Sequence, residues 1–242
     1  MPPSVVIVGP GRLGRTVSEA LRRAGWSVQL ISRGERIPPA PLTWLTVPDR
    51  SIAEAAAATP RGGVVLHASG ATDITPLRPH APAGSLHPLM TFPGPEVAVP
   101  PMQDLPAAVA GDAGAQAAAR QLAGAMGWRA FDVPGDRARY HAAAVIAGNY
   151  ATTLLGVAAE MLAAAGVPAE EAPGLLAPLA LTSLRNAAAV GPRKALTGPV
   201  ARGDQPVIAR HRAAIQSTNR DLLEIYDVLL RATERLINSE PG

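Results

Sequence analysis

The first half of the chain alternates short apolar, β-branched runs with stretches whose apolar positions recur at helical spacing. Ser4–Val8 is a run of the first kind, and Arg12–Ala24 carries apolar residues along one helical face. Gly25 stands where a helix end favours a left-handed residue, and Ser27–Ile31 is again apolar and β-branched. The pattern predicts a strand, a helix and a second strand.

The same alternation continues to about residue 134. Further strands are expected at Leu42–Val47, Val64–Ala68, Gly84–Leu86, Ala107–Ala110 and Arg129–Val133, and helices at Ile52–Ala58 and Ala113–Met126. Strands that alternate with helices favour an α/β fold with a doubly wound parallel sheet.

The pattern changes after Pro134, where no further strand is expected. Apolar positions at helical spacing predict helices over Arg137–Ala165, Glu170–Val190 and Pro206–Asn238. We therefore expect two domains, an α/β domain over residues 1–134 and an all-α C-terminal domain over residues 135–242.

Composition excludes several classes of function. The chain has no cysteine, which removes disulfides, thiol nucleophiles and most structural zinc sites, and we expect no metal. The net charge is only +3 and aromatic residues make up 3%, which argues against nucleic-acid binding. The first residues resemble neither a signal peptide nor a membrane span, so a cytoplasmic protein without membrane contact is expected.

A glycine motif lies directly after the first predicted strand and opens the first predicted helix: Gly9-Pro10-Gly11-Arg12-Leu13-Gly14. In this GxGxxG pattern the first glycine allows a tight turn and the second lets the backbone approach a pyrophosphate. The third lets helix and strand pack closely, which leaves the helix N-terminus facing the phosphates. The sequence thus predicts a dinucleotide-binding, Rossmann-type domain; the alternative is a glycine turn without a ligand.

The residues after the second predicted strand bear on the choice of dinucleotide. NAD-binding domains present an acid there, but this chain has Ser32 and Arg33. An arginine fork and a hydroxyl suit the 2′-phosphate of NADP, so NADP is expected and NAD is the less favoured alternative. Arg33 as an ordinary surface cation is the competing interpretation.

Other residues are expected to border the cofactor because they follow predicted strands. Val47 and Pro48 end the third strand, and Ser69 follows the fourth. For Asp49 we expect the role of a cap on the helix that begins near Ile52.

His87 is the leading candidate for catalysis in the first domain. It ends the fifth predicted strand, and Pro88 restricts its backbone to an extended form. An imidazole with a pKa near working pH could transfer the proton that accompanies a hydride. A histidine that only binds a loop is the alternative, and we expect His67 to be structural and His80 to lie on the surface.

The helical domain offers further candidates for the substrate site. His141 and Asn149 lie eight residues apart on the first predicted helix and share a broad face. Thr197, Arg202 and Asp204 belong to a polar break in the helical pattern, where the arginine could bind an anionic substrate. Helix capping and hydrogen bonds between the domains are the alternatives for these residues.

These motifs together resemble a known family. They are similar to those of an uncharacterised bacterial family that joins a Rossmann domain to a helical domain like that of 6-phosphogluconate dehydrogenase. The similar segments are the glycine turn, Val47-Pro48-Asp49, Ser85-Leu86-His87-Pro88-Leu89, the helix from Tyr140-His141 to Asn149, and Leu196–Asp204. More distantly the chain looks like prephenate dehydrogenase, pyrroline-5-carboxylate reductase, ketopantoate reductase and the deazaflavin-dependent NADP reductases.

The resemblance implies NAD(P)-linked oxidoreduction of a small molecule held between the domains, and a homodimer formed through the helical part. It gives His87, which is similar to the histidine of the His-Pro pair in prephenate dehydrogenase, an acid–base role. Two hypotheses follow: an NADP-dependent oxidoreductase acting on a carbonyl, imine or hydroxy compound, or a non-catalytic NADP-binding sensor or partner-binding protein.

Overall fold

The structure is a computed structural model, and it describes residues 2–92, 98–99 and 101–239. Contacts between its residues divide the chain into two compact units, which meet between Gly148 and Asn149. The expected boundary after Pro134 differs from this division, because the first turns of the following helix contact the sheet.

The first unit is built on one sheet. Its strands are β1 Ser4–Val8, β2 Ser27–Ile31, β3 Leu42–Leu45, β4 Val64–His67, β5 Ala83–Pro88, β6 Pro106–Gly111 and β7 Arg129–Asp132. Within the described residues they lie in the order β2-β1-β3-β4-β5-β6-β7. The chain crosses from β2 to the opposite side of β1, so the switch in strand order falls between β1 and β3, where Rossmann-type folds bind their ligands.

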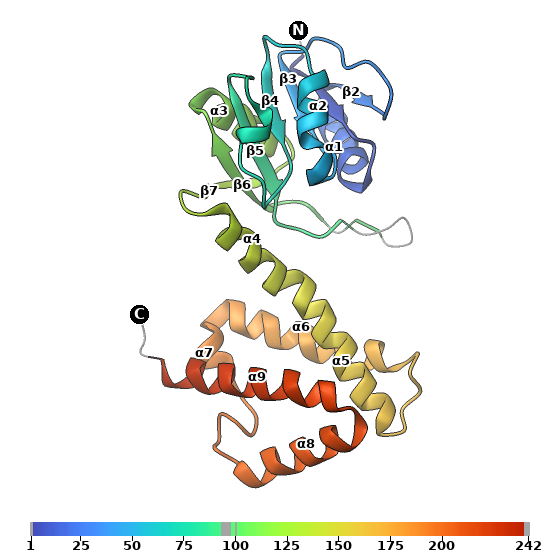
Figure 1. Cartoon of the computed structure of the whole chain (residues 1–242), viewed down its shortest axis with the longest axis vertical. Helices are drawn as coiled ribbons and strands as arrows, with labels where there is room; N and C mark the ends of the chain where they lie inside the picture. The colour runs from blue at the N-terminus through green and yellow to red at the C-terminus, as the bar shows by residue number, and fades with distance from the viewer. Residues whose placement is uncertain (1, 93–97, 100, 240–242) are drawn as a thin grey trace. The chain divides into compact units, whose positions relative to one another are not determined.

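Two layers of helices cover this sheet (Figure 1). The helices of the unit are α1 Arg12–Arg23, α2 Ile52–Ala58, α3 Ala113–Ala125 and α4 Arg137–Val145. Ile7, Trp44 and Leu86 belong to the core beneath α1 and α3, whereas Val8 and Leu45 belong to the core beneath α2. Side chains from successive positions on a strand therefore enter opposite cores, as the pleat of a strand requires.

One pairing departs from the expected parallel sheet, and it reverses the direction of both β6 and β7 relative to β1–β5. β5 and β6 pair antiparallel, with Ser85 opposite Ala110 and His87 opposite Ala108. A parallel pair needs a crossover connection, usually a helix. The described residues between β5 and β6 contain no such helix, and β6 returns alongside its neighbour instead.

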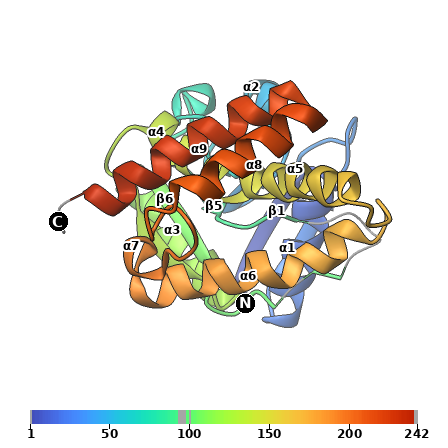
Figure 2. The same ribbon diagram turned by 90° about the horizontal axis from the view of Figure 1, so that it is seen from below.

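The second unit is helical throughout its described residues. It contains α5 Ala151–Ala164, α6 Ala172–Val190, α7 Pro192–Ala195, α8 Gln205–Thr218 and α9 Arg220–Asn238. Helices α8 and α9 pack side by side (Figure 2). The single helix expected over Pro206–Asn238 is wrong: Asn219 is extended (φ −157°, ψ 122°), and its side chain accepts a hydrogen bond from Asp221 N at the start of α9.

Helical structure continues from Arg137 to Ala164, with a π-helical turn at Ile146–Tyr150. By length and hydropathy this segment meets the criteria for a membrane-spanning helix. Core helices of water-soluble proteins pass the same test, so one such segment is weak evidence for a membrane location.

Candidate active site

The glycine turn between β1 and α1 is fixed by close backbone contacts. Gly9 has φ +111°, and a Cβ there would lie 3.0 Å from the carbonyl carbon and oxygen of Thr46. A Cβ on Gly14 would lie 2.0 Å from the Gly9 carbonyl oxygen. The hydroxyl of Thr46, at the end of β3, donates to the carbonyls of Val8 and Gly9 at 3.1 and 2.8 Å. Both glycines are therefore required by the packing of strand, turn and helix.

Gly11 differs from its two neighbours in the motif. A Cβ at Gly11 would have no atom within 4 Å, and the residue precedes α1 with an ordinary φ of −68°. No side chain caps the N-terminus of α1, and its first turn holds no acidic residue. The protein's own packing does not require a glycine here, whereas close approach of a phosphate does.

The other three residues of the motif frame this turn. Arg12 is exposed, with Nη1 3.4 Å from the carbonyl oxygen of Phe92, and Leu13 is half-buried against the core under α1. The Pro10 carbonyl accepts a hydrogen bond of 2.7 Å from Arg15 Nε. These contacts hold the turn in place without filling the space above Gly11.

The loop after β2 is exposed and holds the residues expected to select NADP. Ser32 and Arg33 are both exposed, and Gly34 has φ +85°. The sequence analysis missed one partner: Glu35, whose carboxylate accepts a hydrogen bond from the backbone N–H of Ser32. The loop therefore contains an acid, but this acid binds the loop's own backbone.

Ser69 organises the turn that follows β4. The side chain is buried, and its hydroxyl donates to Asp49 Oδ2 at 2.8 Å and accepts from the N–H of Thr72 at 2.9 Å. The cap that we expected from Asp49 on the helix beginning at Ile52 is therefore wrong. No side-chain hydrogen bond caps that helix. Val47, half-buried, and Pro48, exposed, complete the connection from β3.

The structural role expected for His67 agrees with its surroundings, whereas the surface position expected for His80 is wrong. Nδ1 of His67 accepts from Ser69 N at 3.1 Å, and Nε2 lies 3.0 Å from the Asp73 carbonyl. Burial lowers the pKa of His67 to about 4, so the ring is neutral at pH 7. His80 is 6% exposed, with Nε2 2.8 Å from the carbonyl of Ala56 under α2.

His87 is half-buried at the end of β5, and its Nδ1 lies 2.6 Å from the hydroxyl oxygen of Tyr140. Burial is the main cause that lowers its pKa to about 4, and the positive charge of Arg137 adds to this. The expectation of a pKa near working pH is therefore wrong. The ring is neutral, so it can donate from only one nitrogen at a time.

Three side chains of α4 reach His87 and the turn after β4. Tyr140 packs edge-on against His87, and the ring of His141 lies 6.3 Å from that of His87, centroid to centroid. Arg137 Nη2 donates to the Ser69 carbonyl at 2.7 Å, and its guanidinium lies 5.2 Å from the centre of the Tyr140 ring. The structure thus brings His87, His141 and Ser69 together and adds Tyr140 and Arg137, which the sequence analysis did not select.

Gly70 makes this arrangement possible. A Cβ on Gly70 would lie 2.8 Å from Nε2 of His87 and 2.8 Å from Cδ2 of His141. Any larger residue would push the two rings apart. The glycine directly after Ser69 is a sequence signal for this close approach, and the sequence analysis did not infer the approach from it.

Strand alternation places these groups on one face of the sheet. His67 pairs with Ser85 across β4 and β5, and both point to the same side as Val65 and Ala83 in the core under α2. His87 follows two residues later on the same face. We call His67, Ser85 and His87 the polar row. Its two β5 members, Ser85 and His87, lie opposite small alanines of β6.

The remaining predicted site residues belong to the second unit. Asn149 is exposed in the π-helical turn, and Thr197 and Arg202 are exposed in the loop between α7 and α8. Asp204 accepts from Val207 N and caps α8, which is the alternative we left open for it.

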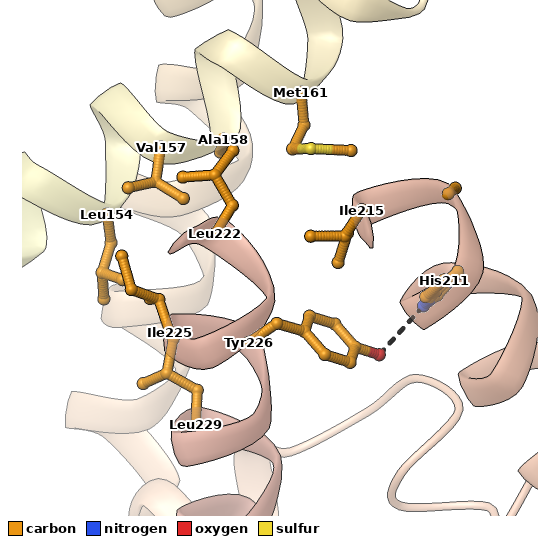
Figure 3. A pocket seen from close by; sticks show the side chains of 11 residues that line it. Leu154, Val157, Ala158, Met161, His211, Ile215, Leu222, Ile225, Tyr226 and Leu229 are labelled. Atoms are coloured by element: carbon orange, nitrogen blue, oxygen red, sulfur yellow. Dashed lines mark hydrogen bonds between the residues drawn. The ribbon is translucent and has the colours of Figure 1, made fainter. Parts of the chain in front are cut away.

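The second unit also contains a pocket of about 400 Å³ between α5, α8 and α9 (Figure 3). Its lining is apolar except for His211 and Tyr226, which point toward each other with Nδ1 and the hydroxyl oxygen 3.1 Å apart. Because this pair satisfies itself and no other polar group converges there, we place the candidate chemistry in the first unit.

Comparison with solved structures shows the same fold over nearly the whole chain. A Bacteroides fragilis protein to which NADP oxidoreductase activity is assigned provisionally is 21% identical, with a TM-score of 0.77 over 97% of this chain and 98% of that one. Protein TM1727 of Thermotoga maritima is 23% identical, with a TM-score of 0.75 over 96% and 98%. A reductive aminase of Aspergillus terreus, in complex with NADPH and ethyl levulinate, is 17% identical, with a TM-score of 0.66 over 97% and 94%.

The sheet, its glycine turn and these likenesses define a Rossmann-type fold followed by a helical unit. A sequence search of curated proteins finds no match. A family model described as a domain of unknown function, DUF2520, matches residues 105–233, and the chain belongs to that family.

Proposed function

We propose that the protein is an NADP(H)-dependent oxidoreductase that acts on a small carbonyl, imine or hydroxy compound. Gly11 is the observation that carries the proposal: its side-chain position is open, and it lies before an uncapped helix N-terminus. A phosphate needs this arrangement, and the protein's own packing does not. The pyrophosphate would be held by the backbone of the Gly9–Gly14 turn.

NADP is favoured over NAD by the loop after β2. Ser32 and Arg33 are exposed donors where the ribose is read, and Glu35 is engaged with the backbone of its own loop. The Bacteroides fragilis protein and the Aspergillus terreus enzyme, both named with NADP or NADPH, are consistent with this choice. When bound, the nicotinamide supplies or accepts a hydride.

His87 and Tyr140 would transfer the proton that accompanies the hydride. Burial raises the pKa of Tyr140, so its hydroxyl keeps its proton, and burial lowers the pKa of His87, so its ring stays neutral and Nδ1 can accept. The Tyr140 hydroxyl then donates to Nδ1, and the imidazole proton resides on Nε2, beside Gly70.

In the direction of reduction, Nε2–H gives its proton to the oxygen or nitrogen of the substrate. Nδ1 takes the hydroxyl proton of Tyr140, and the half-buried tyrosine recovers a proton from solvent. This relay keeps the imidazole neutral and leaves a transient charge on Tyr140. Burial opposes that tyrosinate, and the positive charge of Arg137 offsets part of the cost. The ring of His141 lies near both Gly70 and His87, so it would contact the substrate from the side of α4.

The first test is calorimetric titration of the full chain with NADPH and NADH, followed by a screen for NADPH oxidation with small ketones, 2-oxo acids and cyclic imines. We expect saturable NADPH binding, tighter than that of NADH, and turnover with at least one class. Absence of binding would refute the proposal. Binding without turnover across the panel would instead favour the NADP-binding sensor.

A further inference from the structure

Arg137 is a partly buried cation that forms no ion pair with the described residues. One of its nitrogens, Nη2, donates to the Ser69 carbonyl, but Nε and Nη1 are buried from solvent and have no partner in the described part of the chain. None of the ion pairs between described residues includes Arg137. Buried donors without partners are costly, so a group that accepts from them would stabilise this site.

A second unpartnered group lines the same space. Ser85 is 1% exposed, and its hydroxyl has no partner among the described residues. Ser85 and Arg137 both line a cavity of about 200 Å³, together with Thr72, Asp73 and Gly111. The Asp73 carboxylate accepts from Thr75 N at 2.9 Å, so it is engaged within its own turn. The cavity therefore offers a ligand the unpartnered guanidinium donors of Arg137 and the unpartnered hydroxyl of Ser85.

Charge and size decide the class of ligand. Nε and Nη1 offer charge-assisted hydrogen bonds, which are strongest to carboxylate and phosphate oxygens. Because Asp73 already places one negative charge at the cavity, a monoanion fits better than a dianionic phosphate. A carboxylate matches the single charge of Arg137 and can also accept from the Ser85 hydroxyl.

The position of the cavity relates this carboxylate to the proposed reaction. Ser85 and His87 are two residues apart on one face of β5, a separation of roughly 6.5–7 Å along the strand. A carboxylate at Ser85 would thus stand a few bonds from a carbonyl or imine group at His87. The two sites suit the two ends of one small molecule.

We propose that Arg137 and Ser85 bind the carboxylate of the substrate, which is therefore a small oxo, imino or hydroxy monocarboxylic acid. This inference rests on the proposed function, because it assigns the substrate class of that same site. Thr72 is half-buried at the cavity, but its hydroxyl is already engaged, 2.9 Å from Oγ of Ser69, so Arg137 and Ser85 are the principal donors to the carboxylate.

The test measures binding and not turnover, so it can fail separately from the oxidoreductase proposal. The full chain, with and without NADP, is titrated calorimetrically with formate, acetate, pyruvate and 2-oxobutanoate, and with the neutral amides of the last three. We expect saturable binding of at least one acid and binding of its amide at least tenfold weaker, as expected for a lost charge-assisted hydrogen bond.

The variants separate this site from general charge effects. Arg137→Gln is expected to weaken binding of that acid at least tenfold, and Ser85→Ala about three- to tenfold. Arg139→Gln, at an exposed arginine two residues away on the same helix, should bind like the wild type. If circular dichroism shows that Arg137→Gln does not fold, the affinity of Ser85→Ala for the acid decides whether the carboxylate site exists.

The inference is overturned if acids and amides bind equally, if no acid binds, or if the folded Arg137 and Ser85 variants bind the acid unchanged. Tighter binding of inorganic phosphate than of every acid, abolished by Arg137→Gln, would identify an inorganic anion site instead. NADP titration of the same samples shows separately whether the cofactor proposal stands.

Discussion

The hydroxyl oxygen of Tyr140 lies 2.6 Å from Nδ1 of His87, which joins the first helix after the sheet to the end of β5. The predicted consequence is a neutral imidazole whose proton is on Nε2. Tyr140→Phe removes the donor but keeps the ring that packs edge-on against His87. We expect turnover to fall at least tenfold and its pH profile to change, with NADPH affinity within about threefold of the wild type.

Removal of the imidazole itself should have a larger effect. His87→Asn is expected to lower turnover on an identified substrate by about two to four orders of magnitude, the usual range for general acid–base catalysis. NADPH affinity should stay within a few-fold of the wild type. His211→Asn, in the apolar pocket of the second unit, is the matched control. Normal turnover of the His87 variant would make His141 the leading candidate.

Gly11 allows the cofactor proposal to be tested without disturbing the fold. A Cβ at Gly11 meets no protein atom, so Gly11→Ala should unfold at the wild-type temperature. It should nevertheless weaken NADPH binding about tenfold or more, because the added methyl occupies the approach of the pyrophosphate. Gly124→Ala, an equally open position in α3, should leave affinity unchanged. Equal affinities of the two variants would contradict the assignment.

Cofactor preference should depend on Arg33. Arg33→Asp replaces a donor by an acid at the ribose position, so NADPH binding should weaken about tenfold or more while NADH binding improves. Arg36→Asp, which introduces the same charge at another exposed position of this loop, controls for general electrostatics. If both variants change the NADPH/NADH ratio equally, Arg33 has no specific role.

Two buried histidines should make the fold sensitive to mild acid. The pKa values of His67 and His87 are lowered to about 4 by burial, whereas an unfolded histidine titrates near 6.5. Between these values the unfolded chain binds more protons, so stability falls as pH decreases from about 6.5 toward 4. Each histidine contributes about 1–2 kcal/mol of loss between pH 7 and pH 5.

The measurement is the unfolding temperature of the wild type, His67→Gln and His211→Gln at pH 7 and pH 5. The wild type and the His211 variant should show the full decrease. The His67 variant should start less stable but lose less on acidification. An equal decrease in all three would contradict the assignment of pH sensitivity to His67.

A homodimer through the helical unit remains a prediction. Leu175, Leu179, Leu181 and Leu184 of α6 are each more than half exposed, an amount of apolar surface that a second copy would cover. We expect a dimer by light scattering at micromolar concentration and a shift toward monomer for Leu179→Glu. Gln121→Glu, at an exposed position of α3, should remain dimeric. A wild-type monomer would contradict the prediction.

Local pattern was sufficient for most of the fold. The apolar β-branched runs predicted Ser4–Val8 and Ser27–Ile31 with the bounds of β1 and β2, because short β-branched runs bounded by turn residues carry a strong local signal. The break at Asn219 was not visible, because residues on both sides of it keep apolar positions at helical spacing.

The candidate site was predictable only in part, because its contacts are distant in sequence. His87 and Ser69 follow from their place at strand ends, but Tyr140 and Arg137 gain their meaning from residues more than fifty positions earlier. The burial of His80 likewise depends on the carbonyl of Ala56, which no local pattern reveals. The role and burial of these residues are set by contacts with residues distant in sequence, and not by local secondary-structure propensity.

The antiparallel return of β6 has an evolutionary consequence. Because no helix in the described residues connects β5 to β6, side chains of α4 can reach the sheet beside Ser85 and His87. Residues that would bind the dinucleotide and residues that would meet the substrate are therefore encoded in separate stretches of the gene. Mutations at Arg137 and His141 would change the accepted compounds while the nucleotide-binding residues stay intact, which makes these two codons the targets for a directed-evolution library.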